Sequence, residues 1–308
     1  MSSAESTTRP VTGEQYEIRH GAVRAVATEV GAGLRVFEVD GVPYLHSFSE
    51  HDLPPFGAGT LLAPWPNRVA DGRWEWEGEP QQLTLSEPAR HNAIHGLLRQ
   101  ANWLVVERTE ARVELTSVVN RQAGWPVPLR VGVAYEVGPD GLTITHTATN
   151  IGSGRSPFGV ASHPFPRAGL TPTLDCTLTM PAHTVLPVDD RLLPTGPAES
   201  VEGTKFDFRA GRPMREVTLD TAFGDCRPDE TGFVRHNLIG PDGAGVQVWA
   251  EPVFNWVQVF TPDDLAGQGP AVAIEAMTCP PDALNSGVDL IWLEPGETWQ
   301  GSWGVKKV

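Results

Sequence analysis

Two ionisable side chains stand in strongly apolar strings, where a folded chain would bury them at least partly. His163 lies in the string FGVASHPF, and Glu275 directly follows the strand-like run AVAI. Burial shifts the pKa of a carboxyl or imidazole group, and groups shifted in this way serve as acids and bases near neutral pH. The two side chains are therefore candidates for proton transfer. A lone histidine among apolar neighbours is nevertheless more often structural than catalytic.

Four more polar residues occupy similar positions at the ends of apolar or turn-rich strings. Asn67 and Arg68 end LLAPWPNR, His95 lies in NAIHG, and Asp220 lies in VTLDTAF. Side chains of these types bind polar atoms of a ligand through hydrogen bonds. An arginine in a loop is also commonly solvated or ion-paired. Their separations along the chain do not by themselves bring any two of them together.

The common motifs of phosphate, nucleotide, hydrolase and metal chemistry are absent. The sequence has no phosphate-binding loop, no dinucleotide fingerprint after a strand, no Gly-x-Ser-x-Gly elbow and no His-Glu-x-x-His. His91 and His95 are four residues apart, which suits a shared metal ion only on a helix. Asn92 and Gly96 favour a loop at that place. We therefore predict neither a metal nor a cofactor.

The charge balance argues against polyanionic partners. The 308 residues carry 23 Lys and Arg against 38 Asp and Glu, a formal net charge of −15. Such a chain is repelled by phosphate backbones and anionic membrane surfaces, and no basic run offsets this. No stretch approaches the 18 or so apolar residues of a membrane span. We expect no nucleic acid and no membrane partner.

The ends and the cysteines indicate a cytoplasmic protein. The N-terminal MSSAESTTRPVTGEQ is polar and lacks the apolar core of a secretory signal. We expect residues 1–12 to form a disordered tail and residues 13–308 to form a single domain. Three widely spaced cysteines, Cys176, Cys226 and Cys279, make neither a disulfide framework nor a zinc site.

Short strands joined by turns must position the candidate residues. Gly and Pro together number 60, without a repeating period, which favours many short elements over helical bundles. Residues 129–137 and 142–148 are rich in β-formers and flank Gly-Pro-Asp-Gly, a strong hairpin signal. Asp40-Gly41 marks another tight turn. Since no segment of 12 residues shows a clean helical period, we predict an all-β sandwich or barrel.

Eight blocks of the sequence resemble the aldose 1-epimerase, or galactose mutarotase-like, family and follow each other in the family's order. The resemblance covers most of the chain. The blocks are APWPNRVADGRWEWEGEPQQLTLSEPARHNAIHG, GWP, VASHPF, VDDRLLPTG, VEGTKFDFR, VTLDTAF, WVQVFT, and IEAMTCPPDALNSG followed by LEPGE.

This resemblance implies a fold and an activity. The fold is a large antiparallel β-supersandwich with few short helices. The activity is interconversion of the α and β anomers of a free aldose, a small monosaccharide, without cofactor or metal. We expect a monomer or a homodimer.

The resemblance further implies roles for individual residues. Glu275 is the expected base, which takes the proton of the anomeric hydroxyl, and His163 the acid, which protonates the ring oxygen. Five residues are expected to bind the sugar: Arg68, His95, Asp220, Asn67 and Gln258.

The sequence departs from the family's better-known members beside three of these residues, and two other functions stay open. Pro164-Phe165 follows His163, Thr221-Ala222 follows Asp220, and Ala276-Met277 follows Glu275. These changes touch the expected sugar-contacting surface and leave the sugar unidentified. One alternative is a non-catalytic carbohydrate-binding protein on the same fold. The other is a hexose-phosphate 1-epimerase, which would need several basic residues around the phosphate.

Overall fold

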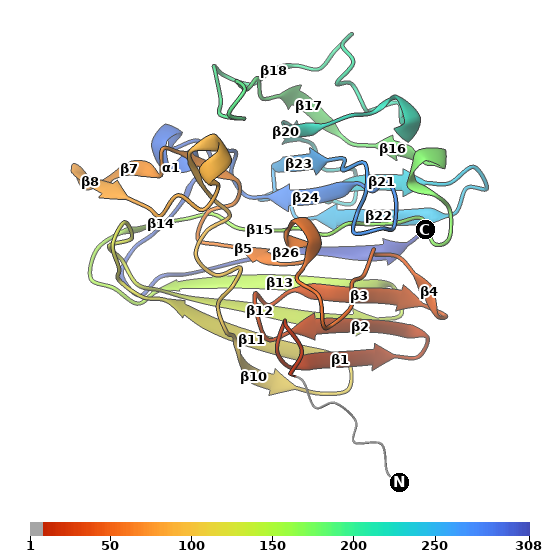
Figure 1. Cartoon of the computed structure of the whole chain (residues 1–308), viewed down its shortest axis with the longest axis horizontal. Coiled ribbons are helices and arrows are strands. Elements are labelled where there is room, and N and C mark those ends of the chain that lie inside the picture. Colours follow the sequence, from red (N-terminus) through yellow and green to blue (C-terminus); the bar gives the residue numbers. More distant parts are fainter. Residues whose placement is uncertain (1–8) are drawn as a thin grey trace.

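Nearly all regular structure in residues 9–308, the part of the chain described by the computed structural model, is β-strand (Figure 1). Within that range the α-helical structure is one short helix, α1 (Ala283–Ser286). Four 3₁₀ turns accompany it: η1 (Pro55–Gly57), η2 (Pro88–Arg90), η3 (Thr173–Asp175) and η4 (Met214–Glu216). The prediction of an all-β chain with few short helices is confirmed.

The largest sheet has nine strands in the order β10-β11-β12-β13-β26-β22-β21-β16-β19 and is antiparallel throughout. It joins the middle of the chain to the C-terminal strand. Its strands are β10 (Leu104–Arg108), β11 (Arg112–Val119), β12 (Leu129–Gly138), β13 (Gly141–Asn150), β16 (Thr177–Thr179), β19 (Arg212–Pro213), β21 (Val234–Ile239), β22 (Gly245–Ala250) and β26 (Thr298–Lys307).

A second, seven-stranded sheet has the order β18-β17-β20-β23-β24-β15-β5 and is also antiparallel. Its strands come from distant parts of the chain. They are β5 (Leu61–Leu62), β15 (Ala161–Ser162), β17 (Ala182–Val185), β18 (Glu199–Ser200), β20 (Asp220–Cys226), β23 (Trp256–Phe260) and β24 (Ala273–Met277).

Smaller sheets complete the fold. A four-stranded meander comprises β1 (Gln15–His20), β2 (Val23–Thr28), β3 (Leu34–Val39) and β4 (Val42–Pro43). Three two-stranded pairs are β6 (Arg68–Ala70) with β9 (Asn92–Ile94), β7 (Arg73–Trp76) with β8 (Glu79–Gln82), and β14 (Ser156–Phe158) with β25 (Ile291–Leu293).

Two hairpins form where the turn residues predicted them. Gly138 pairs with Gly141, which leaves Pro139-Asp140 as a two-residue turn between β12 and β13. Val39 pairs with Val42 across Asp40-Gly41, and both turn residues have positive φ, at 53° and 74°. Glycine and aspartate tolerate this left-handed backbone better than most residues, so short-range turn chemistry sets the register of both hairpins.

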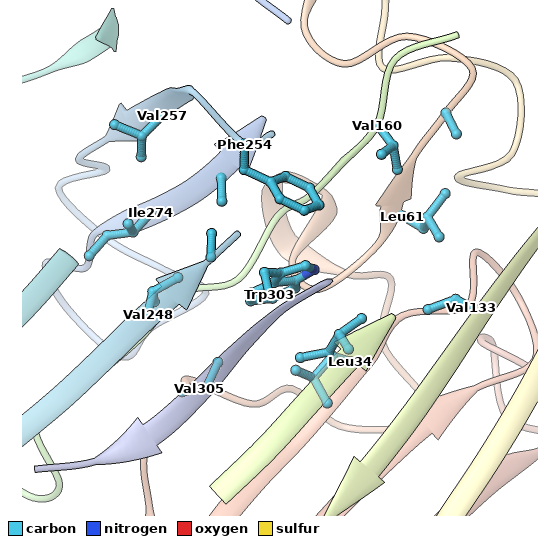
Figure 2. Packing of buried hydrophobic residues seen from close by; sticks show 14 of the residues in the cluster. Leu34, Leu61, Val133, Val160, Val248, Phe254, Val257, Ile274, Trp303 and Val305 are labelled. Atoms are coloured by element: carbon cyan, nitrogen blue, oxygen red, sulfur yellow. The ribbon is translucent and has the colours of Figure 1, made fainter. Parts of the chain in front are cut away.

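The sheets bury a common apolar core. Val248, Trp303 and Val305 of the nine-stranded sheet lie in one cluster with Leu34 and with residues of the seven-stranded sheet, including Leu61, Val257 and Ile274 (Figure 2). Strand β13 presents alternate side chains to this core, as its regular half-buried and buried alternation shows. Sheets that pack over a shared core make a sandwich, as predicted.

Of the expected N-terminal tail, residues 1–8 lie outside the described range. Residues 9–12 are held against the sheets: Arg9 pairs with Glu29, the N–H of Val11 donates to the carbonyl of Glu50, and Thr12 is buried. Among residues 9–308, no helix is long and apolar enough to cross a membrane.

Candidate active site

All seven candidate residues line one cleft with a volume of about 430 Å³. They come from two sheets, the seven-stranded sheet and the β6–β9 pair, or lie directly beside their strands, so the fold gathers residues that are distant in sequence. The remaining lining residues are Phe56, Gly57, Glu87, Arg90, Ile94, Arg99 and Phe260.

Three of the candidates share a face of the seven-stranded sheet. Gln258 on β23 is the cross-strand partner of Glu275 on β24, and directly opposed residues point to the same side. Asp220, the first residue of β20, is opposite Phe260, which stands two positions after Gln258. Since alternate residues of a strand share a face, all three side chains point to the cleft. Nε2 of Gln258 donates a hydrogen bond to Oδ1 of Asp220 at 2.7 Å.

The pairing of β15 with β24 brings His163 to Glu275. Ala161 is paired with Met277, and the same antiparallel register, continued for two residues, sets His163 opposite Glu275. Nε2 of the imidazole lies 3.4 Å from Oε1 of the carboxyl. The ring of Phe165 stacks on the imidazole at a centroid distance of 5.1 Å, which limits its rotation.

The strand that carries Glu275 is shifted relative to the expectation from sequence. We expected the carboxylate to follow the run 271–274, but β24 runs from Ala273 to Met277 and holds Glu275 at its centre. Burial on both faces explains the difference, because every residue of the strand is buried. The carboxyl therefore lies in a sheet interior instead of at a flexible strand end.

Asn67 and His95 fix each other at the ends of β6 and β9. The backbone N–H of Asn67 donates to Nδ1 of His95 at 3.2 Å, and the backbone N–H of His95 donates to the carbonyl of Asn67 at 2.9 Å. Both residues have left-handed backbones, with φ of 55° and 63°. Such conformations cost free energy in non-glycine residues and persist where the surroundings enforce them, commonly at functional sites.

These bonds also define the tautomer of His95. Because Nδ1 accepts a hydrogen bond from a backbone N–H, the ring hydrogen of the neutral imidazole resides on Nε2. Burial, followed by the charges of His163 and Arg68, holds the pKa of His95 well below its ordinary value. His95 is therefore a neutral side chain with one N–H to offer a ligand.

Arg68 is held by carboxylates on two sides. Its Nε lies 2.9 Å from Oε2 of Glu87, and its Nη2 lies 3.5 Å from Oδ2 of Asp220. Burial tends to raise the pKa of Glu87, but hydrogen bonding and charge from Arg68 outweigh it, so the pKa is lowered. Nδ2 of Asn92 donates to the same carboxylate. Arg68 thus holds Asp220 in place as a charged acceptor.

Burial opposes charge on both members of the central pair. It lowers the pKa of His163 to about 4, and the nearby positive charge of Arg99 adds to the effect. It raises the pKa of Glu275 well above the ordinary value, with a further increase from Asp220 that Arg68 partly offsets. Both shifts favour the neutral form of each group, a protonated Glu275 beside an uncharged imidazole.

Two buried oxygen atoms in the cleft wall have no protein partner within residues 9–308. These are Oε2 of Glu275 and Oε1 of Gln258. Buried polar groups are nearly always hydrogen-bonded, and exceptions occur at binding sites. A ligand that carries hydroxyl groups would satisfy both atoms.

The structure also adds residues that sequence reasoning missed. Glu87 does not lie in an apolar string, so its sequence neighbours do not single it out. The one signal for such a carboxylate is that a buried arginine needs a counter-ion. Arg99 lines the cleft together with Arg68, whereas Arg73, which lies close to Arg68 in sequence, bonds Gln82 in the β7–β8 hairpin. Phe56 and Phe260 add an aromatic wall, with ring centroids 5.3 Å apart.

His91 and His95 do not form a metal site together. His91 is bound to Asp71 at 2.9 Å on the surface, while His95 lines the cleft. Residues 9–308 contain no group of three or more His, Cys, Asp or Glu side chains placed to share a metal ion. The cleft instead combines one buried carboxyl and one imidazole, whose nearest atoms are 3.4 Å apart, with hydrogen-bonding groups suited to a polyhydroxylated ligand.

Comparison with known proteins identifies relatives over almost the whole chain. The family model described as aldose 1-epimerase matches residues 14–306. The uncharacterized protein YihR of Escherichia coli K12 is 31% identical over 288 residues, which span 93% of this chain and 91% of that protein. Human galactose mutarotase is 30% identical over 163 residues, 51% of this chain and 46% of the mutarotase.

Solved structures share the architecture at low sequence identity. A galactose mutarotase-like protein from Clostridium acetobutylicum matches with a TM-score of 0.83 at 19% identity, over 95% of this chain and 94% of that chain. A galactose 1-epimerase from Lactobacillus acidophilus matches with a TM-score of 0.80 at 19% identity, over 97% of each chain. At these identities the likeness establishes the β-sandwich fold alone.

Proposed function

The chain belongs to the aldose 1-epimerase family, and we propose that it is an isomerase that interconverts the α and β anomers of a free aldose. The family acts on sugars, and the cleft offers the groups that such a reaction needs. The observation that carries the proposal is the contact of His163 with Glu275, at 3.4 Å, in the cleft lined by the five other candidate residues.

Anomer exchange requires two coordinated proton transfers. One group removes the proton of the anomeric O1 hydroxyl while another protonates the ring oxygen, and the bond from C1 to the ring oxygen breaks. Rotation about C1–C2 turns the other face of the aldehyde toward the ring hydroxyl, and closure returns both protons. Each positioned proton transfer contributes about 10²–10⁴-fold.

The pair of His163 and Glu275 needs to hold one proton throughout this cycle. With that proton on Glu275 both groups are neutral, which their burial favours. With it on His163 they form an ion pair. The two forms are tautomers of equal proton count, so no proton needs to come from solvent when one converts to the other.

Sugar binding favours the ion-pair tautomer in this proposal. The anomeric hydroxyl donates a hydrogen bond to the unpartnered Oε2 of Glu275, and hydrogen bonds to a carboxylate stabilise its charged form. The proton then resides on His163. Glu275 acts as the base toward O1, and His163 acts as the acid toward the ring oxygen.

The other candidates bind and orient the sugar. Asp220 accepts from ring hydroxyls, and Gln258 offers its unpartnered carbonyl oxygen to another. His95 donates from Nε2 to a sugar oxygen near the reacting centre, and Arg68 keeps Asp220 in position. Asn67 holds His95 through their reciprocal bonds.

The proposal is tested by anomer exchange measured by NMR. Purified protein is mixed with glucose, galactose, xylose or arabinose, and saturation transfer between the anomeric protons gives the exchange rate above the uncatalysed background. Glu275→Gln is the test variant, and Glu230→Gln, on an exposed glutamate that does not line the cleft, is the control. We expect exchange with the parent and control and none with Glu275→Gln.

The same samples distinguish a catalyst from a binder. If no sugar is exchanged by the parent but saturation-transfer difference spectra detect sugar binding that Glu275→Gln preserves, the protein is a carbohydrate-binding member of the fold. That outcome would overturn the proposed activity.

A further inference from the structure

Arg99 lies in a turn whose main chain is tightly fixed. The N–H groups of Leu97 and Leu98 donate to the carbonyl of Ala63, and the N–H of Gly31 donates to the carbonyl of Ala101. Gly31 packs so closely that a Cβ atom there would lie 2.4 Å from the carbonyl oxygen of Arg99. The base of the Arg99 side chain is thus held in place at the cleft wall.

The guanidinium of Arg99 is uncompensated in residues 9–308. Arg68 and Arg90, the other arginines of the cleft, both pair with Glu87. Arg99 makes no ion pair and no side-chain hydrogen bond to any described residue, although it is half-buried. Burial lowers its pKa without a carboxylate to offset the effect. A guanidinium in such surroundings gains free energy from an anionic ligand.

The cleft as a whole carries an excess positive charge, in contrast to the acidic chain. Its three arginines face Glu87 and Asp220, because the pair of His163 and Glu275 that shares one proton in the proposed function has no net charge in either tautomer. One positive charge therefore remains, and Arg99 is the cleft cation that has no partner among residues 9–308. This suits one negative charge better than the two that a phosphate ester approaches at neutral pH.

Arg99 lies close enough to the reacting groups for its charge to act on them, and it lies where two cavities meet. Its charge acts on both His163 and His95. A second cavity, of about 160 Å³, adjoins the cleft and shares Gly57 and Arg99 with it. Its wall includes Thr12, Thr60 and Gln100, so it has polar groups as well as room for a substituent.

We propose that Arg99 binds a single negative charge on the exocyclic carbon of the sugar, so that the preferred substrate is an aldose with a monoanionic substituent. The inference rests on the proposed function for the orientation of the ring. If His163 protonates the ring oxygen, the exocyclic carbon, which is attached next to that oxygen, lies on the same side as Arg99. Carboxylate and sulfate groups both fit this chemistry.

The bound anion would also assist the reaction. It would offset the charge of Arg99, which contributes to the lowered pKa of His163. The ion-pair tautomer, in which His163 carries the proton, then becomes easier to form. A charged substrate would therefore be favoured in turnover as well as in binding.

The test compares anomer exchange of four sugars by one method at neutral pH: glucose, glucuronic acid, glucose 6-sulfate and glucose 6-phosphate. The parent is compared with Arg99→Gln and with Arg121→Gln, which removes the same charge from an exposed position outside the cleft. The readout is the ratio of kcat/KM for each charged sugar to that for glucose within the same protein.

We expect a ratio of at least about 10 for the better monoanionic sugar in the parent, which corresponds to one charge-assisted contact. The ratio should fall about 10-fold in Arg99→Gln and stay unchanged in Arg121→Gln. The larger of the carboxylate and sulfate ratios identifies the group. A ratio near one in the parent, a ratio unmoved by Arg99→Gln, or a preference for the phosphate over both monoanions would overturn the inference.

Calorimetric binding separates this inference from the proposed function. If the parent exchanges none of the four sugars, glucuronic acid and glucose are titrated into the parent and Arg99→Gln. Tighter binding of glucuronic acid that is lost in Arg99→Gln would support the subsite while the epimerase proposal fails. Equal binding of the two sugars would overturn the subsite as well.

Discussion

Nε2 of His163 lies 3.4 Å from Oε1 of Glu275, and both side chains are almost completely removed from solvent, with 5% and 2% exposure. A carboxyl and an imidazole at this distance in a dry setting compete for one proton. Their relative position follows from sheet register, whereas their protonation follows from burial and from the charges of Arg99 and Asp220.

The pH profile of kcat/KM should be bell-shaped and broad. The active pair holds one proton, so acid inactivates it when His163 also becomes protonated. Because the pKa of His163 is lowered to about 4, activity should persist below 6.5, the ordinary value, and be lost as the pH falls through about 4. The alkaline limb should lie well above 4.5, since the pKa of Glu275 is raised.

The Arg99→Gln variant provides a check on the pH profile of kcat/KM. Removal of this positive charge should move the acid limb to higher pH, because Arg99 helps to lower the pKa of His163. Rates of anomer exchange, corrected for the uncatalysed reaction at each pH, provide the measurement. An acid limb near pH 6.5 in the parent would show that His163 titrates like an exposed imidazole, contrary to the account.

Glu275→Gln should change stability in a pH-dependent manner. The folded pKa of Glu275 is raised, so its contribution to stability is complete below about 4.5 and is lost as the pH rises toward the folded value. Glutamine does not titrate and escapes this loss. The variant should therefore gain unfolding free energy relative to the parent as the pH rises from about 5 to about 8.

Urea unfolding of the parent, Glu275→Gln and the exposed control Glu230→Gln at the two pH values measures this difference. The control should not diverge from the parent between them. An equal effect of Glu275→Gln at both pH values would mean that Glu275 ionises in the folded protein as readily as in the unfolded chain.

Glu87→Gln should weaken both stability and substrate binding through Arg68. The Arg68–Glu87 pair is 8% and 14% exposed, and removal of one partner from a buried pair costs about 3 kcal/mol or more. Without Glu87, Arg68 interacts more strongly with Asp220 and competes with the sugar hydroxyls for that carboxylate. KM should therefore rise more than kcat falls. The matched control, Glu107→Gln in the exposed pair with Arg112, should cost under about 1 kcal/mol. Similar losses in the two variants would contradict this reading of the network.

Gly96→Ala should be poorly tolerated because of the backbone that follows His95. The residue has φ of 70°, and a Cβ atom would lie 2.0 Å from the carbonyl oxygen of Ala63. Gly21, with φ of 55° and open space around it, is the matched control. We expect a loss of about 1 kcal/mol for Gly21→Ala and more than about 3 kcal/mol for Gly96→Ala, from thermal or urea unfolding. Equal losses would mean that the turn at His95 adapts freely.

Local signals in the sequence were enough to predict the class of fold and some hairpins. Pro139-Asp140 between two β-rich runs acts over a few residues, and turn chemistry there does not depend on the rest of the chain. The end of β24 was misplaced, because burial of Glu275 depends on sheets on both sides of it and not on its neighbours in sequence.

Such local signals do not predict how the residues of the candidate site come together. The resemblance to a family named His163 and Glu275, but their contact depends on strand pairing between segments more than 100 residues apart. The sequence also did not predict the ion-pair partners of Arg68, because a pair such as Arg68–Glu87 depends on proximity in the folded chain. The uncompensated charge of Arg99 becomes visible only when all its neighbours are known.

Rates of anomer exchange for Glu275→Gln, His163→Asn and the double variant test the central claim most directly. If the two residues act as one acid–base unit, each single change should lower the catalysed rate by about 10²–10⁴-fold, and the double variant should lose little more than the worse single variant. Retention of the parent rate by either single variant, or losses that multiply in the double variant, would contradict the account.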